Sequence, residues 1–350
     1  MKQDDNEKKE NLEKKIVSGM MLTLLLASML TLALNIQPVK AEGTIYIRAD
    51  GSIDPPTAPI QRNGDIYTMT GNISSDAYGI VIERNNMTLE GAGYSVQGTG
   101  SKTGIYLSRR SNVTIKSTNI GNFAYGIYIG STSNNSEVEG NKVSNNTNGL
   151  YIKGYNNTIN ENNIVSNRVS GIFLLGSRNT ICGNNITSNG KYGIVLDGPS
   201  NTIHSNAITA NTGCGISVRD GALGSAISRN QIIDNSRDGM YLYNCSDNRV
   251  EVNNITGNSG DGIYLGGSSN NSILNNNISD NGGQRIRSYL STNVISPADI
   301  SPADIPSEPS EKTLTLSIPK EYLIAAAIII VIVVIVIFFP ERKNKKTTSD

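Results

Sequence analysis

Two aspartates occupy the same place in neighbouring segments of similar sequence, and a pair of carboxylates can catalyse hydrolysis. Asp238 precedes Gly-Met-Tyr-Leu, and Asp261 precedes Gly-Ile-Tyr-Leu. If these segments stack as adjacent strands, the carboxylates lie about 4.8 Å apart, near the separation found in retaining glycosidases. Such a pair could also hold calcium with nearby carbonyl oxygens. The alternative, favoured because the chain has no long loop insertions to build a cleft, is a corner that is solvated or paired with Arg219 or Arg237.

A cysteine and the only histidine form a second candidate site. Cys182 follows Ile181, and His204 follows Ile203 in the next segment. Stacked strands would place the two side chains about 4.8 Å apart. This pair is soft enough for copper, but Asn160 and Ser228 flank it, and two ligands alone do not make a metal site.

Aromatic residues recur between Ile and Leu in a repeated Gly-Ile-x-Leu unit. Strand alternation points them outward, away from the Ile and Leu side chains. Val195 and Ser217 interrupt the stripe. Such a stripe could stack on sugar rings or stabilise the sheet through cross-strand contacts, and both interpretations stay open. The aromatic positions are Tyr106, Tyr128, Tyr151, Phe173, Tyr241 and Tyr264.

The segments that carry these residues form a repeat of about 22 residues. Its frame, clearest from Asn157 onward, is Asn-x-Ile-x-x-Asn-x-Ile-x-x-Asn-x-x-x-Gly-Ile-x-Leu. Each period has three short β-branched pieces separated by Asn, Ser and Gly, which predicts three short strands per turn. A single coil cannot bury its Ile side chains, so about nine coils must stack as a parallel β-helix. The Gly of the unit recurs at Gly79, Gly104, Gly126, Gly149, Gly171, Gly193, Gly215, Gly239 and Gly262.

Two columns of asparagine follow from the same stacking. Stacked amides can bond their equivalents in the coils above and below, and Asn tolerates a bent corner. A structural role is therefore expected, with ligand binding as the alternative. The columns are Asn141, Asn162, Asn184, Asn206, Asn230, Asn253 and Asn276, and Asn146, Asn167, Asn189, Asn211, Asn235, Asn258 and Asn281.

The repeat frame resembles the NosD-type β-helix repeats, also called CASH repeats, over residues 79–283. Further likenesses are Thr44-Ile-Tyr-Ile47, the segment from Gly79 to Asn86, and Leu89-Glu-Gly-Ala-Gly93. The resemblance implies an all-β, right-handed, single-stranded parallel β-helix of the pectate-lyase type. It implies three broad roles: a copper-handling periplasmic accessory protein, a polysaccharide-binding or polysaccharide-cleaving protein, or a structural surface rod. The short loops and the aromatic stripe favour a non-catalytic, membrane-anchored surface rod that binds glycans or envelope proteins; a polysaccharide lyase or glycoside hydrolase and a copper-handling protein stay as alternatives.

The two ends of the chain predict export and anchoring. Residues 1–41 are expected to be a signal peptide, or alternatively an uncleaved signal anchor, and 42–78 an N-terminal cap. After the repeats at 79–283, residues 284–321 are rich in Pro and Ser and predict a stalk. Residues 322–340 predict a transmembrane helix, and 341–350 a basic cytoplasmic tail. Together with the resemblance, this order is similar to that of archaeal cell-envelope proteins, with the β-helix outside the membrane.

Charge, cysteine number and glycosylation motifs limit the classes of binding partner. With 30 Lys+Arg and 30 Asp+Glu, the chain gives no electrostatic reason to expect nucleic acid. Three cysteines do not suggest a disulfide framework. The expected partners are the membrane and polysaccharide or surface-layer proteins. Eleven sequons are candidate N-glycosylation sites: Asn72, Asn86, Asn112, Asn134, Asn145, Asn156, Asn185, Asn244, Asn254, Asn270 and Asn277.

Overall fold

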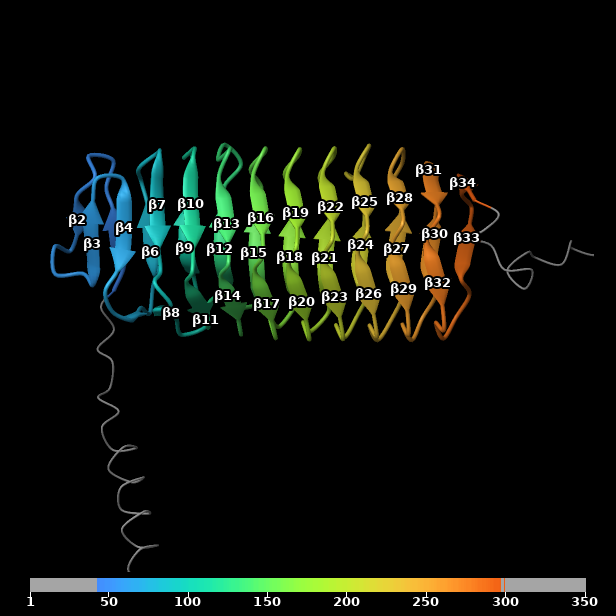
Figure 1. The fold of residues 1–350 in the computed structure, drawn as a ribbon, viewed down its shortest axis with the longest axis horizontal. Helices are drawn as coiled ribbons and strands as arrows, with labels where there is room; N and C mark the ends of the chain where they lie inside the picture. Colours follow the sequence, from blue (N-terminus) through green and yellow to red (C-terminus); the bar gives the residue numbers. More distant parts are fainter. Residues whose placement is uncertain (1–42, 297–298, 300–350) are drawn as a thin grey trace, which may run out of the picture. The chain divides into compact units, whose positions relative to one another are not determined.

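Three parallel β-sheets run along a stack of coils, and each coil contributes one strand to each sheet. The computed structural model describes residues 43–296 and 299. We name the sheets A, B and C, with 12, 12 and 10 strands respectively. The coils follow one another in chain order along the stack (Figure 1). Within these residues no helix is long and apolar enough to cross a bilayer, and the predicted segment 322–340 lies outside them.

Sheet A is parallel except where β2 pairs antiparallel with β1. Its strands are β1 (Ile45–Ile47), β2 (Ile53–Asp54), β6 (Ile80–Ile82), β9 (Thr103–Leu107), β12 (Tyr125–Ile129), β15 (Asn148–Ile152), β18 (Ser170–Leu174), β21 (Tyr192–Leu196), β24 (Ile216–Val218), β27 (Met240–Tyr243), β30 (Ile263–Gly266) and β33 (Ile286–Tyr289).

Sheet B is parallel except for the antiparallel pair β3 and β4. Its strands are β3 (Ile60–Asn63), β4 (Ile66–Met69), β7 (Met87–Glu90), β10 (Val113–Lys116), β13 (Glu137–Glu139), β16 (Thr158–Asn160), β19 (Thr180–Cys182), β22 (Thr202–His204), β25 (Ala226–Ser228), β28 (Arg249–Glu251), β31 (Ser269–Leu274) and β34 (Thr292–Ile295).

Sheet C is parallel throughout, and its strands are β5 (Ile73–Ser74), β8 (Ser95–Gln97), β11 (Asn119–Gly121), β14 (Lys142–Ser144), β17 (Asn163–Val165), β20 (Asn185–Thr187), β23 (Ala207–Thr209), β26 (Gln231–Ile233), β29 (Asn254–Thr256) and β32 (Asn277–Ser279).

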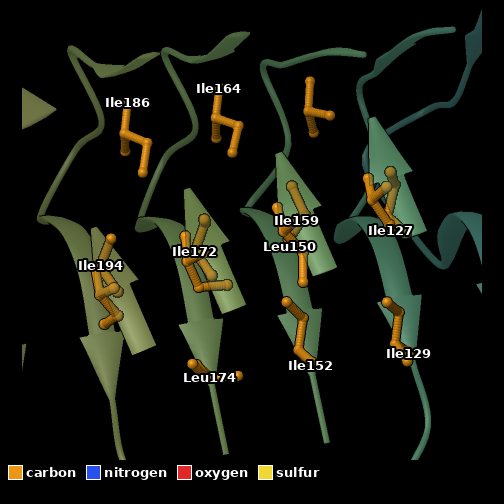
Figure 2. Packing of buried hydrophobic residues seen from close by; sticks show 14 of the residues in the cluster. Ile127, Ile129, Leu150, Ile152, Ile159, Ile164, Ile172, Leu174, Ile186 and Ile194 are labelled. Atoms are coloured by element: carbon orange, nitrogen blue, oxygen red, sulfur yellow. The ribbon is translucent and has the colours of Figure 1, made fainter. Parts of the chain in front are cut away.

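The core is a column of aliphatic side chains inside the coils, as the repeat predicts. Ile159 pairs directly with Ile181, and Ile181 pairs with Ile203. All three are completely buried. Figure 2 shows the same stacking for residues such as Ile164 and Ile186 on sheet C. Each buried Ile contributes roughly 1.5–3 kcal/mol, so the repeated Ile positions hold the coils together.

The asparagine columns are buried ladders that close the corners. Asn184 illustrates the pattern: its Oδ1 accepts the main-chain N–H and the Nδ2 of Asn162, both at 3.0 Å. Its own Nδ2 donates to Oδ1 of Asn206 at 2.9 Å and to the main-chain oxygen of Ile159 at 2.9 Å. Every polar atom of the amide is therefore satisfied inside the protein, which makes the ladder structural.

A third ladder lies at the corner between sheets A and B. It was present in the repeat frame but was not predicted as a column. Asn157 donates its main-chain N–H to Oδ1 of Asn179 at 2.9 Å, and Asn179 donates in the same way to Asn201 at 2.8 Å. The two predicted columns close the other corners, B to C and C to A.

The coils extend beyond the predicted repeat boundary at Gly283. β33 pairs with β30, and β34 pairs with β31, so residues 286–295 belong to the β-helix and not to a stalk. The boundary was missed because Arg285 stands where earlier coils carry Gly. The corner ladder nevertheless continues, since Asn271 donates its main-chain N–H to Oδ1 of Asn293 at 3.0 Å. Asp299 continues the B-to-C ladder by accepting the N–H of Asn276 at 2.7 Å.

The residues predicted as an N-terminal cap supply strands to all three sheets. β1 lies in sheet A, β4 lies in sheet B, and β5 begins sheet C. Ten strands in sheet C indicate ten complete coils, one more than expected, because residues 43–78 contribute a coil of their own; β33 and β34 add a further, incomplete coil.

A candidate binding groove on sheet A

The aspartate pair lies on adjacent coils, as predicted, but its oxygens are directed into the protein. Oδ1 of Asp238 accepts the main-chain N–H of Asp261 at 2.8 Å, and Oδ2 accepts the thiol of Cys214 at 3.8 Å. Oδ1 of Asp261 accepts the N–H of Gln284 at 2.8 Å. Each carboxylate therefore caps the next coil, in the manner of an asparagine ladder.

The burial and the ion pairing of the two aspartates also differ from those expected of a catalytic pair. Asp261 is 6% exposed, and its Oδ2 lies 2.7 Å from Nε of Arg287 rather than beside Arg219 or Arg237. Burial raises the pKa of Asp238, and the neighbouring Asp261 adds to this shift. The arrangement favours the structural alternative that the sequence left open.

The cysteine and histidine lie side by side on sheet B, but they supply only two soft ligands. Cys182 of β19 pairs in register with His204 of β22. Nδ1 of His204 lies 3.2 Å from Oγ of Ser205, and burial raises the pKa of Cys182, which disfavours the thiolate that binds copper. Among residues 43–296 and 299, no group of three or more His, Cys, Asp and Glu residues could hold a metal. The residues at this place therefore do not fit a copper centre.

The cysteines do not form disulfides. Cys182, Cys214 and Cys245 are all free thiols. Burial and the adjacent Asp238 raise the pKa of Cys214 to about 11. Its thiol is therefore protonated at neutral pH, which argues against a nucleophilic role.

The aromatic stripe on sheet A forms a ladder of stacked rings. Tyr106 and Tyr128 have ring centroids 5.2 Å apart, Tyr128 and Tyr151 5.7 Å, and Tyr151 and Phe173 5.3 Å. Tyr125 packs against Tyr128 and Tyr151 from the side. Because neighbouring rings cover both faces of Tyr128 and Tyr151, few faces remain for a sugar. This part of the stripe therefore matches the cross-strand alternative.

The ladder stops at Phe173 and resumes at Tyr241. Tyr241 stacks on Tyr264 with centroids 4.9 Å apart and an interplanar angle of 5°. On its other side the same column holds Ser217 and then Val195, which have no ring. Although both point outward, they are 1% and 0% exposed. Ser217 is covered by Arg219, whose Nε donates to its Oγ at 3.1 Å.

The coil of residues 212–217, here called the recessed coil, has only small outward side chains. Gly213 lies between Lys191 and Arg237 in one column, as the main-chain bond from Arg237 to Gly213 indicates. Cys214 lies between Tyr192 and Asp238 in the next column. The neighbouring coils carry long side chains at these places, so a groove of about 450 Å³ forms at the corner where sheet C leads into sheet A, beside β21 and β27.

The groove has a defined floor and two walls. Gly213 and Cys214 form the floor. Lys191 and Tyr192 line one wall, and Arg237, Asp238 and Tyr241 line the other. A side chain at Gly213 would collide with the main-chain oxygen of Lys191, so glycine is required there. The groove does not follow from the repeat frame, although the run of small residues Thr-Gly-Cys-Gly-Ile-Ser indicates it once the coils are aligned in columns.

The predicted sequons lie on the surface. Nine of the eleven asparagines are exposed, and only Asn134 and Asn254 are half-buried. The buried ladder asparagines are separate residues: Asn184, for example, precedes the sequon residue Asn185. Sequon use itself remains a prediction.

Comparisons with known proteins agree with this architecture. Residues 46–222 match the family described as periplasmic copper-binding protein (NosD). Residues 170–297 match a right-handed β-helix region, which gives the hand of the coils. No curated protein matches the chain.

Similar solved structures share the fold at low sequence identity. The mannuronan C-5 epimerase AlgE4 A-module of Azotobacter vinelandii is 19% identical, with a TM-score of 0.50, over 67% of this chain and 79% of that one. A double mutant of the periplasmic alginate epimerase AlgG is 15% identical, with a TM-score of 0.48, over 67% and 69% of the two chains. An alginate lyase from Paenibacillus sp. is 13% identical, with a TM-score of 0.43, over 65% and 90%. At such identities the likeness concerns the fold alone, whereas the match over residues 46–222 covers half of the sequence: the chain belongs to the NosD family of right-handed parallel β-helix proteins.

Proposed function

We propose that this protein is a non-catalytic, membrane-anchored surface rod that binds glycans in the groove over the recessed coil. The observation that carries the proposal is the position of Tyr241. Its ring is stacked on Tyr264, with centroids 4.9 Å apart, and also packs beside Tyr243, with centroids 6.0 Å apart, and it lines the groove. An aromatic face at the edge of a polar hollow is a common way to hold a sugar ring.

The composition of the groove supports a sugar as ligand. Tyr241 contributes aromatic surface, while Lys191, Arg237 and Thr212 contribute hydrogen-bond donors. Sugars present both C–H faces and hydroxyl groups, so this mixture suits them. A repeated envelope polymer would also suit a rigid stack of coils, since the coils keep the groove at a fixed place.

The anchoring half of the proposal rests on sequence. Residues 322–340 are the candidate membrane span, and the basic residues after them favour a cytoplasmic C-terminus. Both lie outside the described residues. Protease treatment of intact cells would test the topology: the β-helix should be released, and an antibody epitope at the C-terminus should be protected.

Neither alternative function has an observation in its favour as specific as the groove. For a lyase or hydrolase, Asp238 and Asp261 would need free oxygens, but their Oδ1 atoms cap main-chain N–H groups. For copper handling, the role in the family's description, Cys182 and His204 would need further ligands, and the described residues bring none to them.

A glycan array probed with the purified chain tests the proposal. Wild type should bind a subset of glycans, and Tyr241→Ala should reduce that binding at least about tenfold, since stacking and burial of one aromatic ring contribute a few kcal/mol. Tyr128→Ala is the matched control because its ring faces are occupied by Tyr106 and Tyr151. Absence of all glycan binding, or equal loss in both variants, would refute the proposal.

A further inference from the structure

The charges around the groove are not balanced among themselves. Lys191 and Arg237 stand on opposite walls, two coils apart in the same column, with Gly213 between them. Two coil spacings separate their main chains by roughly 10 Å. Within the part of the chain that the structure describes, neither side chain forms an ion pair with an acid.

The single carboxylate that lines the groove is already engaged. Asp238 accepts the N–H of Asp261 at 2.8 Å and the thiol of Cys214 at 3.8 Å. These two bonds hold its oxygens inward, and burial raises its pKa. It therefore offsets the two cations only in part.

A third cation stands beside the groove. The guanidinium carbon of Arg219 lies 4.9 Å from the ring centroid of Tyr192, and Nζ of Lys191 lies 5.0 Å from the same centroid. The carboxylate of Asp197 lies close enough to Arg219 to be affected by its charge, and Asp220 is the next residue along the chain. Oδ1 of Asp220 accepts Nδ2 of Asn244 at 2.6 Å. Arg219 therefore has an acid close by, whereas Lys191 and Arg237 carry the positive charge that lines the groove itself.

We infer that the groove is selective for an anionic glycan, whose sugar ring stacks on Tyr241 while its acidic group lies between Lys191 and Arg237. This inference rests on the proposed function and adds the chemical class of the ligand. The acidic group can be a carboxylate or a sulfate. Arg237 can donate two parallel bonds to either group, whereas Lys191 acts as a point charge.

The test compares glycans that share a backbone and differ in charge. Wild type, Lys191→Gln, Arg237→Gln and the double variant are measured against neutral dextran, carboxymethyl-dextran, dextran sulfate and an array containing neutral, carboxylated and sulfated glycans. Lys153→Gln is the control, because Lys153 lies over Tyr151 on the aromatic ladder and outside the groove. Circular dichroism and the unfolding midpoint verify that each variant is folded.

The expected result is binding of acidic glycans only. We expect that binding to fall at least about tenfold in each single variant, to remain unchanged in Lys153→Gln, and to weaken with added salt. The dextran and array arms identify carboxylate or sulfate as the preferred group. Equal binding of neutral and acidic glycans, or acidic binding that survives in the double variant, would overturn the inference and leave the proposed function standing. If the wild-type protein binds no glycan at all, both this inference and the proposed function are overturned.

Discussion

Oδ1 of Asp238 accepts the main-chain N–H of Asp261 at 2.8 Å. The two residues occupy equivalent places in adjacent coils, and the next coil repeats the bond between Asp261 and Gln284. Neither Gly260 nor Gly283 has room for a Cβ beside these carboxylates, which explains the glycines. A pair of acids that looks catalytic in the sequence is thus part of the coil-to-coil hydrogen bonding.

We predict that Asp238→Asn is folded and at least as stable as wild type at neutral pH. Because burial raises the pKa of Asp238, the native state binds the proton more tightly than the unfolded state does. Stability from this group is therefore greatest at low pH and falls as pH rises from the unfolded pKa through the folded one. Urea unfolding between pH 3 and 8 should show that the amide variant lacks this decline.

The exposed Asp76→Asn variant serves as control for Asp238→Asn. If Asp238→Asn instead unfolds the β-helix, the amide cannot replace the carboxylate as a cap. If Asp238→Asn remains folded but abolishes a polysaccharide-cleaving activity, that result would support a catalytic role for Asp238 and Asp261 and contradict the structural role.

The asparagine ladders should dominate local stability. Asn184→Ala removes two donors and one acceptor from a residue that is 1% exposed, and it leaves partners such as Asn162 unsatisfied. The expected loss is about 2–4 kcal/mol, since each orphaned buried group costs roughly 1–3 kcal/mol. Equilibrium unfolding in urea provides the measurement.

The neighbouring residue is a matched control for the ladder. Asn185 is exposed, and its side chain donates to Oδ1 of Asn163 at 3.0 Å on the surface. Asn185→Ala should therefore change stability by less than about 0.5 kcal/mol. Equal effects of the two substitutions would mean that the buried ladder contributes no more than a surface bond.

The thiols should react slowly in the native protein. Cys214 and Cys245 are 5% and 1% exposed, and burial raises the pKa of both. Titration with a thiol reagent should therefore modify the half-buried Cys182 first and all three only after unfolding. Rapid native modification of Cys214 would show that the floor of the groove opens.

Copper binding can be tested on the same preparation. With two soft ligands, Cys182 and His204, the protein should not retain stoichiometric copper after dialysis against a competing chelator, and metal analysis would measure this. Cys182→Ser should remove any residual copper. One tightly held copper per chain, unaffected by that substitution, would place a metal site where the described residues do not suggest one.

Most of the architecture could be predicted because it repeats. Direct pairing of Ile159, Ile181 and Ile203 follows from a period of about 22 residues, since only stacked coils can bury all three. The final coil was missed because Arg285 replaces the repeated Gly, although Asn293 still continues the corner ladder. Period detection depends on recurring residues and fails where one is replaced.

The groove could not be predicted in the same way, because it forms where one coil has small side chains between two coils with long ones. Gly213 and Cys214 are unremarkable alone, and they form a floor only because Lys191, Tyr192 and Arg237 rise on the neighbouring coils. The Tyr106 to Phe173 stripe was correctly placed on one face. The rings of this stripe cover one another, whereas Tyr241 lies beside the groove. This difference depends on ring orientations, which a sequence does not contain.

Filling the groove is the most direct test of glycan binding at the recessed coil. Cys214→Tyr places a ring where coils carrying Tyr125 and Tyr192 already hold one, so the β-helix can accept it, while the floor of the groove between Tyr192 and Asp238, next to Gly213, is occupied. The affinity of the glycan that wild type binds best on the array should be measured by calorimetry for both proteins, after their unfolding midpoints are compared. If the glycan lies in the groove, the variant should be folded and should have lost glycan binding. A folded Cys214→Tyr variant that binds the glycan as tightly as wild type would contradict this placement.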